Sequence, residues 1–534
     1  MKTKYLKILS VSAVAATVAI ASCIKDLDTI PIDPDVVTSA TVYKDVTAYK
    51  EVLAKCYSGL AMSGQQGPNG MPDISGIDEG FGQYFRQIWC AQELTTDEAI
   101  IGWNDPGLPD YHVQNWTPSN TFITALYNRI YYQISLYNEF IRESSDSKLS
   151  DRGITGDDAA TVQTFRAEAR FLRALSYYHA LDMFGNVPFV TENDEVGAFL
   201  PSQITRANLF NYIESELKAI ESLLVAPTAN EYGRADQAAA WMLLARLYLN
   251  AEVYTGTAKY TECLTYCNKV ISSAYTLEPD YSHLFLADNN TASEIIFPIC
   301  FDGIHTRTWG GSTFLVHAEV GGTMSPAAFG IDGGWAGLRT TSAFVNKFSD
   351  ITGATDKRAM FYTSGQSKEI SSISVFTDGY AITKWKNVTS TGVAGSNGTF
   401  PDTDFPVFRL ADAYLMYAEA VVRGGTGGTL NDAFNYINLV LDRAYGDDSG
   451  ELSSPTDVTL DFILDERARE LYWECTRRTD LIRFGRFSKS TYLWPWKGGV
   501  AAGKSLDNFD YDLFPIPGTD IGANPNLVQN HGYN

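Results

Sequence analysis

The chain has 534 residues, of which 45% are hydrophobic and 19% are charged, a composition typical of globular proteins. Its formal net charge of −22 argues against a nucleic-acid partner, because an acidic body and a phosphate backbone repel each other. Length does not fix the number of domains, because structural repeats can extend one continuous core over many residues.

The first 22 residues predict an export signal. Three lysines among the first seven residues precede an uncharged apolar run at 8–21, which is too short for a comfortable transmembrane helix. The run ends in Ile20-Ala21-Ser22-Cys23, which resembles a bacterial lipobox. We therefore predict a lipoprotein signal peptide at 1–22 and lipidation of Cys23, with a plain secretory peptide as the alternative. Acyl chains would hold the mature chain on a membrane without spanning it.

Apolar residues recur at helical spacing over most of the mature chain. The predicted fold is therefore mainly α, a tetratricopeptide-like scaffold of helical hairpins with long irregular loops and a few short β-strands, near 294–300 and 380–385. We treat 23–534 as a single domain, with the scaffold at about 41–297 and 407–487. The predicted helices cover 41–61, 119–141 with Ser119 as N-cap, 164–184, 208–224, 236–250, 260–274, 407–422, 432–445 and 460–484.

Two long stretches, 64–118 and 298–406, are rich in glycine and lack helical periodicity, which predicts loops. Each carries tryptophan in a glycine-rich or polar setting. Trp103 precedes Asn104, Trp309 is followed by a predicted turn at 310–313, and Trp335 follows the glycine pair 333–334. The sequence favours rings displayed on loops, although each of these tryptophans could instead belong to the core.

The common catalytic motifs are missing: there is no His-Glu-x-x-His, P-loop, zinc cysteine pair or Gly-x-Ser-x-Gly elbow. The six histidines are scattered. A glycosidase carboxylate pair stays open, because 63 Asp and Glu residues create many chance pairs whose separation depends on the fold. The abundance of acids is therefore no evidence of catalysis.

The three tryptophans, with Asp78 and Arg86, have the chemistry of a sugar-binding site. An indole stacks on the apolar C–H face of a pyranose, while a carboxylate and a guanidinium bind its hydroxyl rim. Each stacked ring would contribute about 1–2 kcal/mol. Three such rings predict a Kd between millimolar and micromolar.

Several segments resemble, in the right order, the SusD/RagB family of outer-membrane nutrient-binding lipoproteins. The resemblance begins at the lipobox and spans nearly the whole mature chain. The matching segments are Arg166–Tyr178, Asp182–Pro188, Phe408–Ala420, Asp465–Leu471, Arg477–Gly485 and Asn524–Asn530.

The resemblance implies a function without catalysis. Family members are helical-repeat lids over a TonB-dependent (SusC-like) transporter, anchored by lipid in the outer membrane and facing the cell exterior. Other surface glycan-binding lipoproteins and an amylase are further partners that it suggests. The chain also resembles the family's starch-binding founder, which implies that Trp103, Trp309 and Trp335 form an aromatic arc for an α-glucan or maltooligosaccharide, with Asp78 and Arg86 as polar contacts.

One departure from the founder concerns the first ring of the arc. Where the founder has Trp-x-Trp before an asparagine, this chain has Ile101-Gly102-Trp103-Asn104, so one stacking platform is lost. We therefore keep two alternatives to a starch-binding protein that delivers glucan to its transporter. One is the same scaffold binding a different glycan or a peptide, and the other is a glycoside hydrolase.

The resemblance suggests no catalytic cofactor and a possible structural calcium. Its ligands would come from two loops that carry oxygen side chains, which suit this hard cation. Ordinary Asx turns are the alternative for these loops. The predicted ligands are Asp288, Asn290, Asp402 and Asp404.

Overall fold

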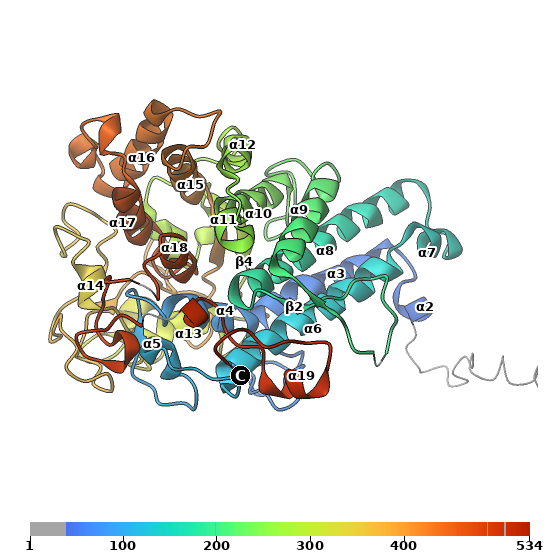
Figure 1. Cartoon of the computed structure of the whole chain (residues 1–534), viewed down its shortest axis with the longest axis horizontal. Coiled ribbons are helices and arrows are strands. Elements are labelled where there is room, and N and C mark those ends of the chain that lie inside the picture. Colours follow the sequence, from blue (N-terminus) through green and yellow to red (C-terminus); the bar gives the residue numbers. More distant parts are fainter. Residues whose placement is uncertain (1–38, 198, 489, 507–508, 534) are drawn as a thin grey trace, which may run out of the picture.

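The computed structural model describes residues 39–197, 199–488, 490–506 and 509–533. It confirms the mainly α prediction: helices form the scaffold and the strands are short and paired in twos (Figure 1). The signal peptide and Cys23 lie outside the described residues. One hydrophobic core cluster includes residues from Tyr43 to Leu527. No helix among the described residues has the length and apolar character needed to cross a membrane.

Three long helices form the N-terminal half of the scaffold, on the right of Figure 1: α3 (Val46–Ala61), α6 (Thr121–Glu143) and α8 (Gly156–Met183). They pack against one another. The predicted cap at Ser119 is wrong by one residue, because the Asn120 side chain accepts the Ile123 amide N–H at 3.0 Å. Helix α8 begins eight residues before the predicted start because its first two turns are mostly polar and show no apolar period.

The scaffold continues through the middle and the C-terminal part of the chain. Helix α10 packs against α12, α12 against α15, and α15 against α16. Because α12 and α15 are neighbours, the chain leaves the scaffold after α12 and returns to it at α15. These helices are α9 (Arg206–Ile220), α10 (Gln237–Leu249), α11 (Ala251–Thr255), α12 (Tyr260–Ile271), α15 (Leu410–Val422), α16 (Leu430–Tyr445), α17 (Leu460–Leu471) and α18 (Arg477–Arg483).

A two-stranded antiparallel sheet joins the two ends of the 298–406 segment. Strand β4 (Ile295–Ile299) pairs with β8 (Phe405–Arg409), so residues more than one hundred positions apart lie side by side. Residues 407–409, predicted as the start of a helix, therefore belong to a strand. The segment between these strands is an insertion whose ends the scaffold holds together.

The two longest helices that sequence periodicity missed within the predicted loops are α4 (Tyr84–Glu93) and α13 (Gly311–Ala318). Every residue of both helices is buried. Helix α13 carries few polar residues and therefore shows no clear polar face, whereas α4 contains both polar and apolar residues but lies between glycine-rich and polar stretches that predict loop. The remaining short elements are α2 (Ser39–Val42), β1 (Ile100–Ile101), α5 (Asp110–Val113), α7 (Asp146–Asp151), β2 (Val187–Pro188), β3 (Gln203–Ile204), β5 (Leu338–Arg339), α14 (Ser342–Val345), β6 (Phe361–Tyr362), β7 (Ala381–Ile382) and α19 (Gly518–Ala523).

The single helix predicted at 460–484 is wrong, because the chain breaks between α17 and α18. Trp473 and Cys475 take positive φ angles of 61° and 63°, which is costly for residues other than glycine. Tertiary contacts hold this break. The Trp473 backbone N–H donates to a Glu98 carboxylate oxygen at 3.1 Å, and its indole N–H donates to the Glu98 carbonyl at 3.0 Å.

A buried ion network joins β8, α16 and α17. Arg409 is 1% exposed, and its guanidinium lies 2.8 Å from a Glu294 oxygen, 2.5 Å from Glu470 and 2.6 Å from Glu474. Arg443 also pairs with Glu294 and Glu470. Arg409 and Glu470 both belong to segments that resemble the family. They connect the strand and the helices inside the core rather than facing a ligand.

This network predicts acid sensitivity at Glu470. Burial opposes its ionisation, but the guanidinium groups of Arg443, Arg409 and Arg358 outweigh burial and lower the pKa of Glu470 to about 2. A lowered folded-state pKa stabilises the fold above pH 4.5, and this contribution is lost as pH falls toward 2. We expect Glu470→Gln to lower the melting temperature at pH 7, and the difference from wild type to narrow between pH 4.5 and 2. A constant difference in thermal melts across this range would contradict the assignment.

Candidate functional site

Four aromatic rings form a continuous row in the part of the molecule built from the two irregular segments, 64–118 and 298–406. The ring centroids of Trp103 and Trp335 are 6.2 Å apart, those of Trp335 and Trp309 are 6.1 Å apart, and those of Trp309 and Phe400 are 5.0 Å apart. The successive ring planes differ by 46°, 51° and 51°. All three indoles are partly exposed. We call these four residues the aromatic arc.

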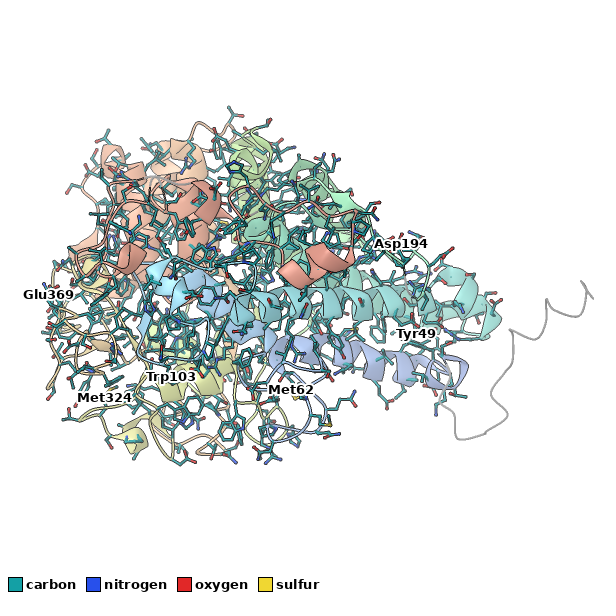
Figure 2. The ribbon with its side chains drawn as sticks, turned by 60° about the horizontal axis from the view of Figure 1, so that its bottom comes forward. Tyr49, Met62, Trp103, Asp194, Met324 and Glu369 are labelled. Carbon is teal, nitrogen blue, oxygen red and sulfur yellow. The ribbon has the colours of Figure 1, made fainter. Side chains whose placement is uncertain are left out.

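Trp103 reaches the arc because two distant segments pair as strands. Strand β1 runs antiparallel to β5, and the Gly102 amide N–H donates to the Gly337 carbonyl at 3.0 Å. The Trp103 indole N–H then donates to the Trp335 carbonyl at 3.3 Å. In Figure 2, Trp103 lies in the left half of the view and Tyr49 in the right half. This pairing joins positions more than two hundred residues apart.

The His317 ring packs against one face of the Trp335 ring. The two rings stack with centroids 4.7 Å apart and planes 23° apart, and the Trp335 backbone N–H donates to the His317 carbonyl at 2.8 Å. The His317 ring nitrogens lie 2.5 Å from the Gly333 carbonyl and 2.9 Å from the Thr399 carbonyl. Burial lowers the pKa of His317, although both carbonyl contacts oppose this shift. This histidine therefore joins the Trp335 loop to the Phe400 loop.

Trp309 is anchored to the first irregular segment. Its backbone N–H donates to Glu79 at 3.3 Å and its indole N–H to the Asn69 side chain at 3.3 Å. A methyl group on Gly80 would lie 2.7 Å from the Trp309 β-carbon, so only glycine allows this approach. The predicted turn at 310–313 is wrong, because these residues include the N-cap and the first turn of α13.

The two predicted polar contacts differ in their exposure. Asp78 is exposed, and its Oδ1 accepts the backbone N–H groups of Gly80 and Phe81 at 2.9 and 3.1 Å. Arg86 belongs to α4 rather than to a loop and is 8% exposed. It donates to the Trp309 carbonyl at 3.4 Å, and its guanidinium carbon lies 5.8 Å from the Trp103 ring centroid.

The Arg86 side chain is buried next to the arc, and one of its nitrogen donors makes no hydrogen bond. Burial lowers the pKa of Arg86, and nearby Asp105 and Asp78 partly offset this effect. Its Nε has no hydrogen-bond partner although it is buried. Such a donor is costly unless a further group satisfies it. The structure thus brings together all five predicted site residues, with Asp78 on the surface and Arg86 below it.

Sequence reasoning missed two contributors to the site, Phe400 and His317. Phe400 lies near the end of the predicted loop 298–406, and no pattern in its sequence context singled it out. His317 lies on the fully buried helix α13, so its sequence context gave no indication of a surface site.

Three of the four side chains predicted to bind calcium accept hydrogen bonds from other protein groups. Protein groups donate hydrogen bonds to all three carboxylates of this set. Ser390 donates to Asp288, Ser396 and Gly303 donate to Asp402, and Phe301 and Tyr232 donate to Asp404. No group of three or more His, Cys, Asp or Glu side chains in the described ranges is arranged to hold a metal. Calcium at these two loops therefore stays a prediction.

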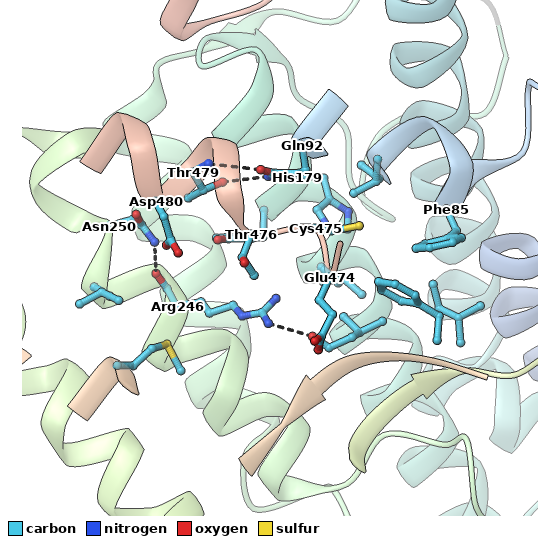
Figure 3. Close-up of a pocket in the computed structure, with 18 of the residues that line it drawn as sticks. Phe85, Gln92, His179, Arg246, Asn250, Glu474, Cys475, Thr476, Thr479 and Asp480 are labelled. Carbon is cyan, nitrogen blue, oxygen red and sulfur yellow. Dashed lines mark hydrogen bonds between the residues drawn. The ribbon is translucent and has the colours of Figure 1, made fainter. Parts of the chain in front are cut away.

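A cavity of about 50 Å³ in the interior lies apart from the arc, among α4, α8, α10 and α18. Gln92 and Thr479, which line it, bond to each other at 2.8 and 3.2 Å (Figure 3). The space suffices for a few water molecules, each of which needs roughly 10–15 Å³ of such volume. It is too small for a sugar ring, so the exposed arc is the stronger candidate for a ligand site.

Comparison with known proteins shows one family throughout. The model of the SusD family matches residues 355–533, and a model described as "Starch-binding associating with outer membrane" matches 82–249. The starch-binding protein SusD of Bacteroides thetaiotaomicron is 39% identical and covers 100% of both chains. The SusD-like protein P2 of Formosa agariphila is 27% identical over 84% of this chain and 88% of its own.

Solved structures show the same fold. A SusD superfamily protein from Bacteroides vulgatus superposes with a TM-score of 0.70 and 19% identity, over 92% of this chain and 100% of its own. Surface glycan-binding protein A from Bacteroides thetaiotaomicron, solved in complex with laminarihexaose, gives 0.68 and 21%, over 91% and 99%. The arrangement of the scaffold and the full-length identity together show that this chain belongs to the SusD family.

Proposed function

We propose that this protein binds starch or maltooligosaccharides at the cell surface and delivers them to a TonB-dependent outer-membrane transporter. The observation that carries the proposal is the aromatic arc. Its indoles are partly exposed and offer apolar faces to successive sugar rings. The exposed carboxylate of Asp78 on the rim supplies a polar group for sugar hydroxyls, and the buried guanidinium of Arg86 supports the Trp309 loop.

The tilt between the rings supports a curved ligand. Adjacent indole planes differ by 46° and 51°, so the arc is not a flat platform. The α-1,4-linked glucan chain curves helically, whereas a flat, extended β-1,4-linked chain would need nearly parallel rings. The full-length relative that is named as starch-binding supports the same ligand class.

The cellular context of the proposal rests on the family. The lipobox at Cys23 and the family model described as associating with the outer membrane support a lipid-anchored protein on the cell exterior. Transfer to a SusC-like transporter, with other surface glycan-binding lipoproteins and an amylase nearby, belongs to the same proposal. In this role the chain binds glucan and leaves its cleavage to other proteins.

Electrophoresis in a native gel that contains starch tests the proposal. We expect starch to retard wild type and Trp103→Ala to migrate faster than wild type, while its helical circular dichroism is unchanged. Equal retardation of both would contradict a role for the arc. Release of reducing ends from starch by the pure protein would favour the hydrolase alternative instead.

Gly337 offers a test that leaves every aromatic ring in place. A β-carbon at this position would lie 2.6 Å from the Trp103 indole, so Gly337→Ala must displace that ring. We expect a roughly tenfold loss of affinity for maltoheptaose by calorimetry, corresponding to about 1.4 kcal/mol. Gly333→Ala is the matched control, because nothing lies within 4 Å of a β-carbon there. Equal affinities of the two variants would show that Trp103 placement does not matter.

A further inference from the structure

A surface groove of about 530 Å³ lies beside the arc, between the loop 76–81 and the first residues of α6 and α19. Its volume falls within the range of roughly 300–1,000 Å³ that is usual for small-ligand sites. Neither the prediction from the sequence nor the proposed arc includes this groove.

The lining of the groove matches a neutral sugar. The Phe81 ring is partly exposed and is fixed by Phe122, whose ring centroid lies 4.9 Å away. Four hydroxyl groups share the groove with this ring, and no charged side chain lines it. An aromatic face with surrounding hydroxyls complements the C–H face and rim of a pyranose, whereas an anionic ligand would find no cation there. The hydroxyl residues are Ser119, Thr121, Thr124 and Thr519.

One loop connects the groove to the arc. Gly80 lies directly against Trp309, and the next residue, Phe81, lines the groove. Asp78 is exposed on the same loop, and its carboxylate accepts the backbone N–H groups of both residues. The loop that contacts Trp309 therefore also carries the exposed Asp78 and the Phe81 ring that lines the groove.

We propose that this groove is a second subsite for the same α-glucan chain, which reaches it across Asp78. This inference rests on the proposed function of the arc. It predicts that long glucans gain affinity from the groove, whereas a trisaccharide that fills only the arc does not.

Two variants from different elements test the subsite with soluble amylose and maltotriose as probes. Phe81→Ala removes the ring, and Thr124→Lys fills the groove from α6 without altering the loop. For each variant we expect the affinity for amylose to fall about fivefold, the effect of losing one stacked ring. The affinity for maltotriose should stay within about twofold of wild type. Thr164→Lys, a partly exposed threonine on α8, is the matched control.

The outcomes separate the subsite from the arc. Unchanged amylose binding by Thr124→Lys, in a variant with wild-type melting temperature, would overturn the subsite. An equal loss of amylose and maltotriose binding in both variants would also overturn it, because the loop would then only position the arc. Trp335→Ala, measured in parallel, should lose both probes. If it binds both as wild type does, the proposed function itself fails, whatever the groove variants show.

Discussion

Arg409→Met is expected to destabilise the fold by about 3–5 kcal/mol, the usual cost of removing one partner from a buried ion pair. The substitution keeps an apolar stem of similar length but removes five donors from the core. Glu294, Glu470 and Glu474 are buried and would keep only their other cationic partners. Urea unfolding followed by far-ultraviolet circular dichroism measures the change as a lower midpoint at unchanged slope.

An exposed arginine provides the control for this prediction. Arg486 pairs with Asp461 at 3.2 Å, but the two side chains are 40% and 82% exposed. Surface pairs of this kind contribute about 0–1 kcal/mol. Arg486→Met should therefore unfold close to wild type. If both variants lost the same stability, burial of the Arg409 network would not explain its role.

Trp335→Ala is expected to have the largest effect on ligand binding, because Trp335 lies between the other two indoles. Its removal deletes one stacking face, worth about 1–2 kcal/mol. It also removes the ring that contacts both Trp103 and Trp309. We expect the affinity for maltoheptaose to fall by roughly 30-fold or more, about 2 kcal/mol. Calorimetric titration measures this change directly.

The control for Trp335 is another partly exposed tryptophan. Trp241 on α10 bonds to Glu221 through its indole N–H at 2.8 Å and lies on the scaffold, outside the irregular segments. Trp241→Ala should leave maltoheptaose affinity unchanged. A similar loss in both variants would indicate a general effect of tryptophan removal and would contradict a local arc.

The helical scaffold could be predicted where helices have one buried face. The period of apolar residues located α6, α9, α10 and α12 closely. It failed at α13, a short helix with few polar residues, and at α4, which is enclosed by stretches that predict loop. It also failed at Trp473, where contacts with Glu98 stabilise a positive φ that no local pattern encodes.

The site was predictable in its residue types but not in its construction. The glycine-rich or polar settings of Trp103, Trp309 and Trp335 indicated exposed rings, and the resemblance to the family grouped them into one site. The order of the rings depends on the pairing of β1 with β5, a long-range contact without a local signal. The same holds for His317, which supports Trp335 from a buried helix.

The most direct test of the account is a calorimetric titration of the wild-type protein with maltoheptaose and, separately, with the flat β-1,4-linked cellohexaose. We predict saturable binding of maltoheptaose with a Kd between millimolar and micromolar, and weaker binding of cellohexaose. No heat from maltoheptaose, or tighter binding of cellohexaose, would contradict an aromatic arc that is built for α-glucan.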